Sequence, residues 1–374
     1  MKRIYIITIF LLGILTCSGQ GYNYKYHQFE IRSHYGTSMP HHSYMNYIIK
    51  DHAFIGEINY SIKTSGSKSW HTLWRCPELG VGYLSGGLGN SEILGHSHSI
   101  FGFWGVPIIE KERIILKYRL GAGLAYLTKK FDTRSNYYDL AIGSHFNAHL
   151  YFALLLDIKP SDLPLYISPG ISFNHFSSGA IESPNLGINQ LSVNIGIKYL
   201  YSRYPYSLRK ISVPYLYNSE WEISAYYAAS IKENDSHDDK KYFVNTLLID
   251  AGLRTSLKRS WGLGVCFIYD PSLKKFLNEQ EKYENSFNLF RAGIHAYHEI
   301  YFTYDLSLVL QAGSYVYNKY RDGNIITWIY TKFGLRYTFS NGMFANVILK
   351  THAAAADYIE FGVGYRFLRL QNTY

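Results

Sequence analysis

Residues 357–367 read Asp-Tyr-Ile-Glu-Phe-Gly-Val-Gly-Tyr-Arg-Phe, and this stretch decides the fold of the chain. Alternate side chains of an extended strand point to opposite faces. One face carries the apolar and aromatic residues Ile359, Phe361, Val363, Tyr365 and Phe367. The other face carries Glu360, Gly362, Gly364 and Arg366. Such a strand suits the wall of a membrane barrel, with lipid on one side and a wet lumen on the other.

The same alternation recurs along the chain, for example in residues 113–126 and 189–201. It predicts about sixteen strands, near 29–36, 52–63, 79–86, 97–108, 113–126, 145–157, 164–177, 189–201, 220–231, 242–256, 261–269, 289–302, 305–317, 325–338, 342–350 and 357–367. Most connections alternate between short turns and long polar loops, which is typical of an outer-membrane barrel. We therefore expect an all-β, antiparallel transmembrane barrel.

Two connections, Thr64–Glu78 and Ser202–Ser219, are long where the alternation requires short turns. The second lies near the middle of the chain, so the strands could form two tandem barrels of about eight strands each. Each half would then need its own closing pair of strands. For that reason we favour one barrel of about sixteen strands and keep the tandem arrangement as the alternative.

The composition excludes several other classes of protein. The 374 residues are 47% hydrophobic, 17% aromatic and 17% charged, with a net charge of +9. Disordered chains have fewer aromatic residues and more charge, and three cysteines are too few for a disulfide scaffold. Whether Cys76 and Cys266 pair is left open, because spacing alone does not test disulfide geometry.

The N-terminus predicts export. Lys2 and Arg3 precede an apolar run, so residues 1–19 are expected to be a signal peptide. We then expect 20–201 to be the barrel half that carries the active site and 202–219 to be a connection. The last segment, 220–374, would be a C-terminal half ending in an outer-membrane terminal strand. The predicted location is the outer membrane.

One stretch carries chemistry: Ile171-Ser-Phe-Asn-His-Phe-Ser-Ser-Gly179. His175 and Ser177 continue the apolar face of their strand and lie about 6.6 Å apart along it, a distance that an imidazole can span. Asn189 opens the next strand in the same phase. A nucleophile, a base and a group that orients the base predict a serine esterase. Ser178 and Gly179 are the candidate oxyanion donors.

The predicted position on a lipid-facing rim selects an amphiphilic ester, because polar groups facing lipid are costly to keep without a use. Lys129, Lys130 and Arg134 lie in a long loop at the same rim and are candidates for binding substrate phosphates. The scattered histidine pairs lack the companion ligands of a metal site, so no metal is expected. Nucleic-acid binding is not expected of an exported barrel.

The motif His175-x-Ser177, followed by Pro184-Asn-x-Gly-Ile and a polar residue twelve positions after the serine, resembles the lipid A 3-O-deacylases. The resemblance implies an outer-membrane barrel that removes an ester-linked 3-hydroxyacyl chain from lipid A, with His175, Ser177 and Asn189 as its triad. Two positions depart from the family pattern. Ser178 stands where the family commonly has an asparagine oxyanion donor, and Asn189 stands where it often has an acid.

An asparagine at this spacing is also similar to the outer-membrane phospholipases A, which need calcium and dimerise. The alternatives are therefore a phospholipase A or a non-catalytic barrel that serves as a pore or scaffold. The expected partners are lipid A or lipopolysaccharide as substrate and the outer-membrane lipids, with a homodimer left open. No cofactor is expected, except calcium under the phospholipase alternative.

Overall fold

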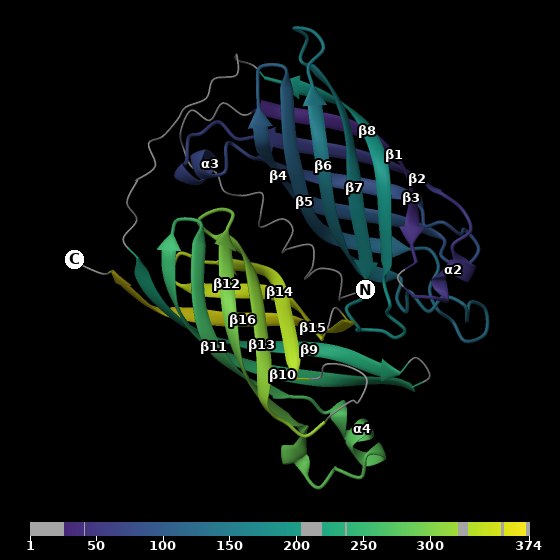
Figure 1. The fold of residues 1–374 in the computed structure, drawn as a ribbon, viewed down its shortest axis with the longest axis vertical. Helices are drawn as coiled ribbons and strands as arrows, with labels where there is room; N and C mark the ends of the chain where they lie inside the picture. Colours follow the sequence, from purple (N-terminus) through teal and green to yellow (C-terminus); the bar gives the residue numbers. More distant parts are fainter. Residues whose placement is uncertain are drawn as a thin grey trace.

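The computed structural model describes residues 26–40, 42–202, 219–235, 238–320, 328–352 and 355–371. These residues form sixteen β-strands that close into two separate antiparallel barrels (Figure 1). The predicted signal peptide, residues 1–19, and most of the predicted connection, residues 202–219, lie outside the described part of the chain. No helix among the described residues has the length and apolar character needed to cross a membrane.

The first barrel has eight strands: β1 (Tyr26–Met39), β2 (Ala53–Lys63), β3 (Glu78–Gly87), β4 (His96–Glu110), β5 (Ile114–Leu127), β6 (Phe146–Ile158), β7 (Leu165–Ser177) and β8 (Ile188–Tyr201). Each strand pairs with the next, and β1 closes the barrel on β8 from His27↔Tyr201 to Met39↔Asn189. Two short helices, α2 (Met45–Ile48) and α3 (Ser69–Leu73), lie in its connections.

The second barrel repeats this arrangement with β9 (Glu220–Asp235), β10 (Asp238–Ser256), β11 (Arg259–Tyr269), β12 (Phe290–Tyr301), β13 (Leu306–Asn318), β14 (Ile329–Thr338), β15 (Met343–His352) and β16 (Ala355–Gln371). It closes where β16 pairs with β9. Helix α4 (Leu273–Glu279) and the 3₁₀ turn η2 (Ser286–Leu289) lie in the connection between β11 and β12.

The favoured single barrel of about sixteen strands is therefore wrong, and the alternative of two tandem eight-stranded barrels is confirmed. The reason lies in the strand edges. The edge of β8 is hydrogen-bonded along its length by β1, so it is not available to β9. Each half contains its own closing pair of strands, which is the requirement that two tandem barrels must meet.

The lumen of each barrel is filled by paired charges. In the first barrel Lys117 Nζ lies 2.8 Å from Glu78 Oε1 and 2.7 Å from Asp157 Oδ2. In the second, Lys332 Nζ lies 2.9 Å from Glu360 Oε1. An eight-stranded barrel is just wide enough for such side chains. The large lumen that a sixteen-stranded barrel would offer for transport is thus absent from the described part of the chain.

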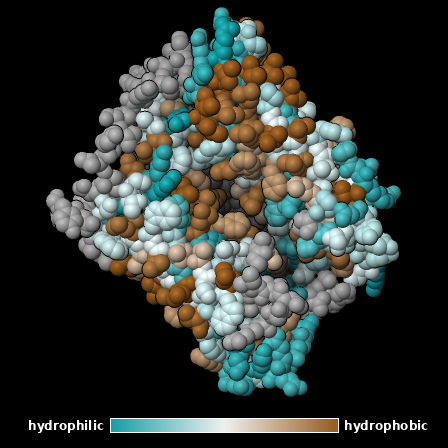
Figure 2. Space-filling view, in the orientation of Figure 1, coloured by the Kyte–Doolittle hydropathy of each residue, from teal (hydrophilic) through white to brown (hydrophobic). Residues whose placement is uncertain are grey.

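The outside of both barrels is apolar, as the alternation predicts. Ile31, Ile58 and Ile197 on the first barrel and Leu263 and Val363 on the second are each more than half exposed. Figure 2 shows apolar residues over much of the barrel walls, whereas hydrophilic residues gather at the lower edge, where Figure 1 places α4. This is the surface of a barrel surrounded by lipid.

Each barrel has two unlike ends. We call the end at which its odd-numbered strands finish the loop end, and the opposite end the turn end. In the first barrel the loop end carries residues 128–145 and 178–187. Its turn end carries short turns and the long connection with α3.

The barrels touch at the turn end through Trp74, which follows α3. The Trp74 indole Nε1 donates a 3.0 Å hydrogen bond to the carbonyl oxygen of Tyr301, and Lys258 Nζ lies 4.4 Å from the Trp74 ring centroid. Trp104, on the outer face of β4, contacts Phe302 with ring centroids 4.5 Å apart and the rings tilted by 40°. The long connection Thr64–Glu78 of the first barrel therefore packs against the second barrel.

The two cysteines lie in different barrels. Cys76 is buried just after α3, whereas Cys266 lies on β11 in the lumen of the second barrel, with its Sγ 3.0 Å from Tyr330 Oη. No disulfide joins them in the described structure.

Candidate active site

The end of β7 brings His175 and Ser177 to the outer face of the first barrel. Along this strand Ser172, Asn174 and Phe176 are buried in the lumen, so the odd-numbered residues between them face outward. Their outward orientation agrees with the alternation in the sequence. His175 and Ser177 continue the apolar row at the loop end.

Asn189 stands directly opposite His175 across the β7–β8 pair. The Asn189 Oδ1 atom lies 2.6 Å from His175 Nδ1. An amide oxygen accepts hydrogen bonds, so this contact is made by the tautomer with its proton on Nδ1. In that tautomer Nε2 carries the lone pair that can accept a proton.

Ser177 is the last residue of β7 and is 5% exposed. Its hydroxyl makes no hydrogen bond to any residue that the structure describes. Ser177 lies two residues beyond His175 on the same outward face, about 6.6 Å along the strand. Catalytic hydrogen bonds often tighten only when substrate binds.

The loop 178–187 folds back over this pair. Gly187 has φ +78°, and a Cβ at that position would lie 3.0 Å from His175 Cε1, so a side chain there would press on the imidazole. The Gly187 amide donates a 2.9 Å hydrogen bond to the carbonyl oxygen of Ala141. The loop is thereby fixed to the neighbouring loop 128–145.

The two donors of Ser178 are already used within this loop. Its amide donates to Asn185 Oδ1 at 2.8 Å, and its hydroxyl donates to the carbonyl oxygen of Glu182 at 3.0 Å. The Gly179 amide makes no hydrogen bond to the residues described. Of the two expected oxyanion candidates, Gly179 is the one whose donor is not already engaged.

Asn185 is a residue whose role the sequence did not indicate. Its Nδ2 atom is buried and has no hydrogen-bond partner in the described part of the chain. A buried donor without a partner costs roughly 1–3 kcal/mol, which makes the Asn185 amide a candidate donor to a substrate oxygen. Asn185 belongs to the Pro-Asn-x-Gly-Ile motif, but nothing in that pattern shows which way its amide turns.

The three basic residues proposed for phosphate do not form one cluster. Lys130 Nζ lies 3.7 Å from Glu182 Oε2, beside the loop that covers the candidate triad. The amide of Arg134 donates to Asp132 Oδ1 in an exposed turn, and Lys129 packs against Gly95. Of the three, Lys130 is the residue that the structure brings to the site.

The scattered histidine pairs of the sequence are His41-His42, His96-x-His98 and His145-x3-His149, and the last pair is held by other groups. His145 Nδ1 lies 2.7 Å from the Leu127 carbonyl oxygen, and His149 bonds to Ser99 and Asn174 inside the lumen. His41 lies outside the described residues.

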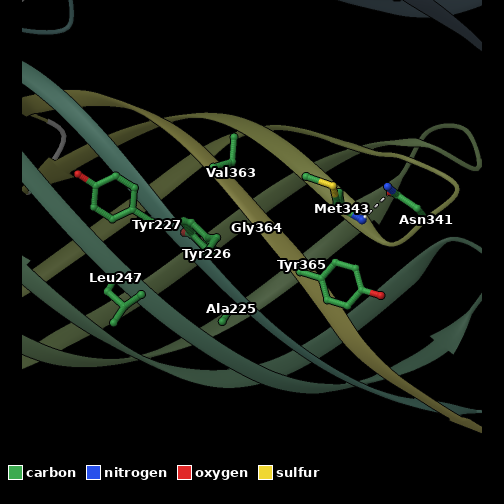
Figure 3. Close-up of a pocket in the computed structure, with 9 residues that line it drawn as sticks. All are labelled: Ala225, Tyr226, Tyr227, Leu247, Asn341, Met343, Val363, Gly364 and Tyr365. Atoms are coloured by element: carbon green, nitrogen blue, oxygen red, sulfur yellow. Dashed lines mark hydrogen bonds between the residues drawn. The ribbon is translucent and has the colours of Figure 1, made fainter.

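A groove of about 690 Å³ lies on the second barrel, away from the candidate triad (Figure 3). It is lined by Ala225, Tyr226, Tyr227, Leu247, Asn341, Met343, Val363, Gly364 and Tyr365. This groove is an open, mainly apolar part of the lipid-facing wall. It holds no nucleophile paired with a base, so the site at β7 and β8 is the better candidate.

Comparison with known families divides the chain at the same place as the fold. Residues 55–198 match the family model described as lipid A 3-O-deacylase (PagL). Residues 220–370 match the model described as acyloxyacyl hydrolase, C-terminal domain. The two matches together span most of both barrels, and the candidate triad lies within the first.

Similar solved structures include the outer membrane enzyme PagL, at 16% identity and a TM-score of 0.32, covering 45% of this chain and 97% of that chain. A BenF-like porin from Pseudomonas fluorescens Pf-5 has 10% identity and a TM-score of 0.24, covering 93% of this chain and 99% of that chain. No curated protein matches the chain.

Proposed function

The chain belongs to the lipid A 3-O-deacylase (acyloxyacyl hydrolase) family of outer-membrane hydrolases, and we propose that Ser177, His175 and Asn189 form its catalytic triad. The observation that carries the proposal is the 2.6 Å contact between His175 Nδ1 and Asn189 Oδ1 on the lipid-facing side of the barrel. Ser177 lies in phase with both. The reaction is hydrolysis of the ester that links a 3-hydroxyacyl chain to lipid A.

In the first half of the reaction, Ser177 Oγ attacks the ester carbonyl carbon while His175 Nε2 accepts the hydroxyl proton. The imidazolium is held by Asn189 Oδ1. The tetrahedral intermediate then expels the sugar oxygen, which takes the proton back from Nε2. An acyl group remains on Ser177. In the second half, His175 Nε2 takes a proton from a water molecule whose oxygen attacks the acyl carbonyl carbon. The second tetrahedral intermediate expels Ser177 Oγ, which takes the proton back from Nε2, and a free 3-hydroxy acid leaves.

The oxyanion of each tetrahedral intermediate needs donors in place before the reaction. The Gly179 amide and Asn185 Nδ2 are two donors of the loop 178–187 that form no hydrogen bond to the described residues. Asn185 would thereby supply the amide that the family commonly places directly after the serine. The amide and hydroxyl of Ser178 are bonded within the loop and would fix its shape instead.

The position of the triad suits a substrate that stays in the membrane. The acyl chains of lipid A can remain beside the apolar outer wall of β7 and β8 while the ester reaches the loop end. Lys130, close to the loop 178–187, is placed to meet a phosphate of the sugar head group.

The proposal is tested by expressing the full-length protein and its Ser177→Ala variant in a host without deacylase and weighing the extracted lipid A by mass spectrometry. We expect the wild type alone to remove one 3-hydroxyacyl mass. Heat-modifiable mobility on gels shows that both proteins are folded.

Two outcomes would contradict the proposal. Accumulation of lysophospholipid with unchanged lipid A would support the phospholipase alternative, and added calcium or a chelator would then test the metal requirement. Unchanged lipids from a folded wild-type protein would indicate a non-catalytic barrel.

A further inference from the structure

The loop that carries the proposed oxyanion donors is bound by the second barrel as well as by the first. Three hydrogen bonds join it to Glu233, near the end of β9. The Ser183 amide donates to Glu233 Oε2 at 2.6 Å, and the Ser183 hydroxyl donates to the Glu233 carbonyl oxygen at 3.4 Å. In return, the Glu233 amide donates to the carbonyl oxygen of Ala180 at 3.1 Å.

The two bonds from Ser183 are partly buried at this contact between the barrels. Glu233 is 8% exposed, and the bond from the Ser183 amide goes to its carboxylate. A hydrogen bond to a charged acceptor is stronger than one to a neutral acceptor. Both ends of the segment 180–183 are held, so the contact fixes its backbone as well as one side chain.

Two further contacts come from the second barrel. Ile359 on β16 occupies the space that a side chain at position 179 would need, and Gly179 itself has φ +60°. Lys241 Nζ on β10 lies 3.3 Å from Glu182 Oε1. Strands β9, β10 and β16 therefore all touch the loop between Gly179 and Ser183.

The contacts lie next to the groups that the reaction uses. Gly179 is a proposed oxyanion donor and touches Ile359 directly. Asn185 lies two residues after Ser183, and its Oδ1 is tied back to the Ser178 amide. A shift of the segment 180–183 would therefore move both donors relative to Ser177, and a misplacement of about 1 Å can cost about 10²-fold in rate.

We propose that the second barrel completes the active site of the first by fixing the loop 178–187, with Glu233 as the main positioning residue. This inference rests on the proposed function. It assigns the C-terminal half a role in catalysis that acts through the loop 178–187 and not through direct contact with the reacting atoms. The Trp74 contact at the turn end supports this role, since it holds the second barrel beside the first at a second point.

The test uses full-length Glu233→Ala, Glu233→Gln and Glu284→Ala, with Ser177→Ala as the inactive reference. Glutamine keeps an oxygen that can accept from the Ser183 amide. Glu284 is a matched control, because it lies in a loop of the second barrel and pairs with Lys319. Turnover of lipid A in mixed micelles gives kcat and KM. Hydrogen exchange reports on loop 178–187.

For Glu233→Ala we expect kcat to fall about 10- to 100-fold with KM nearly unchanged, because oxyanion stabilisation acts in the transition state. Exchange in the loop should rise. Glu233→Gln should recover most of kcat, and Glu284→Ala should match the wild type. If Glu233→Ala fails to fold, Ile359→Ala tests the same claim from β16.

An unchanged or higher kcat in folded Glu233→Ala, with Ser177→Ala inactive, would overturn the positioning role and leave the proposed function intact. A loss in Glu233→Ala through KM alone, or no recovery in Glu233→Gln, would also overturn it. A folded wild type that is inactive on lipid A would overturn both proposals.

Discussion

The seventh strand of each barrel ends near a histidine, and the two histidines face opposite ways. His175 on β7 faces outward and contacts Asn189. His352 on β15 faces the lumen, where its Nε2 lies 3.0 Å from Tyr315 Oη and its Nδ1 lies 3.4 Å from Asp357 Oδ2. The two barrels share a fold. The difference in strand phase places the His175 imidazole on the lipid-facing wall and the His352 imidazole among charged groups in the lumen.

The comparison shows why strand phase carries function in this fold. Successive side chains alternate between lipid and lumen, so a shift of one residue moves an entire set of groups to the other side. The residue two positions after His175 is Ser177, whereas the residue two positions after His352 is Ala354. At the position that corresponds to Ser177 the second barrel therefore has an alanine, and its histidine faces the lumen instead of the lipid.

The largest expected effect tests this contrast directly. His175→Ala should lower kcat for lipid A deacylation by about 10⁴-fold or more, because the base of a triad is lost. His352→Ala should leave kcat within about twofold of the wild-type value, because the partners of His352 lie in the lumen of the second barrel. Initial rates in mixed micelles measure both. Comparable losses in the two variants, in folded protein, would show that the contrast between the barrels is mistaken.

A smaller effect is expected at Asn185. Asn185→Ala should lower kcat by about 10²- to 10³-fold, the usual cost of one oxyanion donor. The double variant Ser178→Asn, Asn185→Ala should recover part of this loss, because it moves the amide to the position that the family commonly uses. Asn341→Ala, in a turn of the second barrel, is the matched control. Full activity of Asn185→Ala would remove this residue from the mechanism.

The smallest effect concerns two buried loop carboxyls with opposite surroundings. Burial raises the pKa of Asp139 to about 7, and its Oδ2 has no partner among the described residues. Burial also opposes ionisation of Asp270, but Lys232 and Arg291 outweigh it and lower the pKa of that carboxyl. Among the described residues Asp139 has no ion-pair partner, whereas Asp270 pairs with Lys232 and Arg291.

These pKa shifts predict opposite responses to pH. The loop 128–145 should lose stability as pH rises from about 4, the ordinary pKa of an aspartate in an unfolded loop, to about 7. The stability that Asp270 contributes should instead be lost as pH falls below about 4. Hydrogen exchange, corrected for its intrinsic pH dependence, should show loop 128–145 at least about tenfold less protected at pH 8 than at pH 5. Asp139→Asn should abolish that difference, and an equal difference in the variant would contradict the assignment.

Much of the barrel wall and part of the candidate active site could be predicted, because both depend on the alternation of neighbouring residues along a strand. Alternation alone predicts the outward row from Ile359 to Phe367 and the shared phase of His175 and Ser177. Asn189 could be placed on the same face and rim as His175 because a single loop joins their strands.

The rest depends on contacts between distant residues. Alternation shows which face of β8 meets lipid but not which strand binds its edge, so β1 and β9 were equally acceptable partners. Glu233 is fifty residues from Ser183 in sequence, and no local pattern links them. The orientation of Asn185 is set by the Ser178 amide, a contact that residue types alone do not reveal.

The separate closure of the two barrels has a consequence for biogenesis. Pairing of β1 with β8 needs only strands from the first half, whereas β9 cannot be closed until β16, near the C-terminus, has arrived. During assembly the first barrel can thus be sealed while Glu233 and Ile359 are not yet in place. An esterase built this way would reach full activity only when insertion of the whole chain is finished, so that a half-assembled protein would spare the membrane lipids around it.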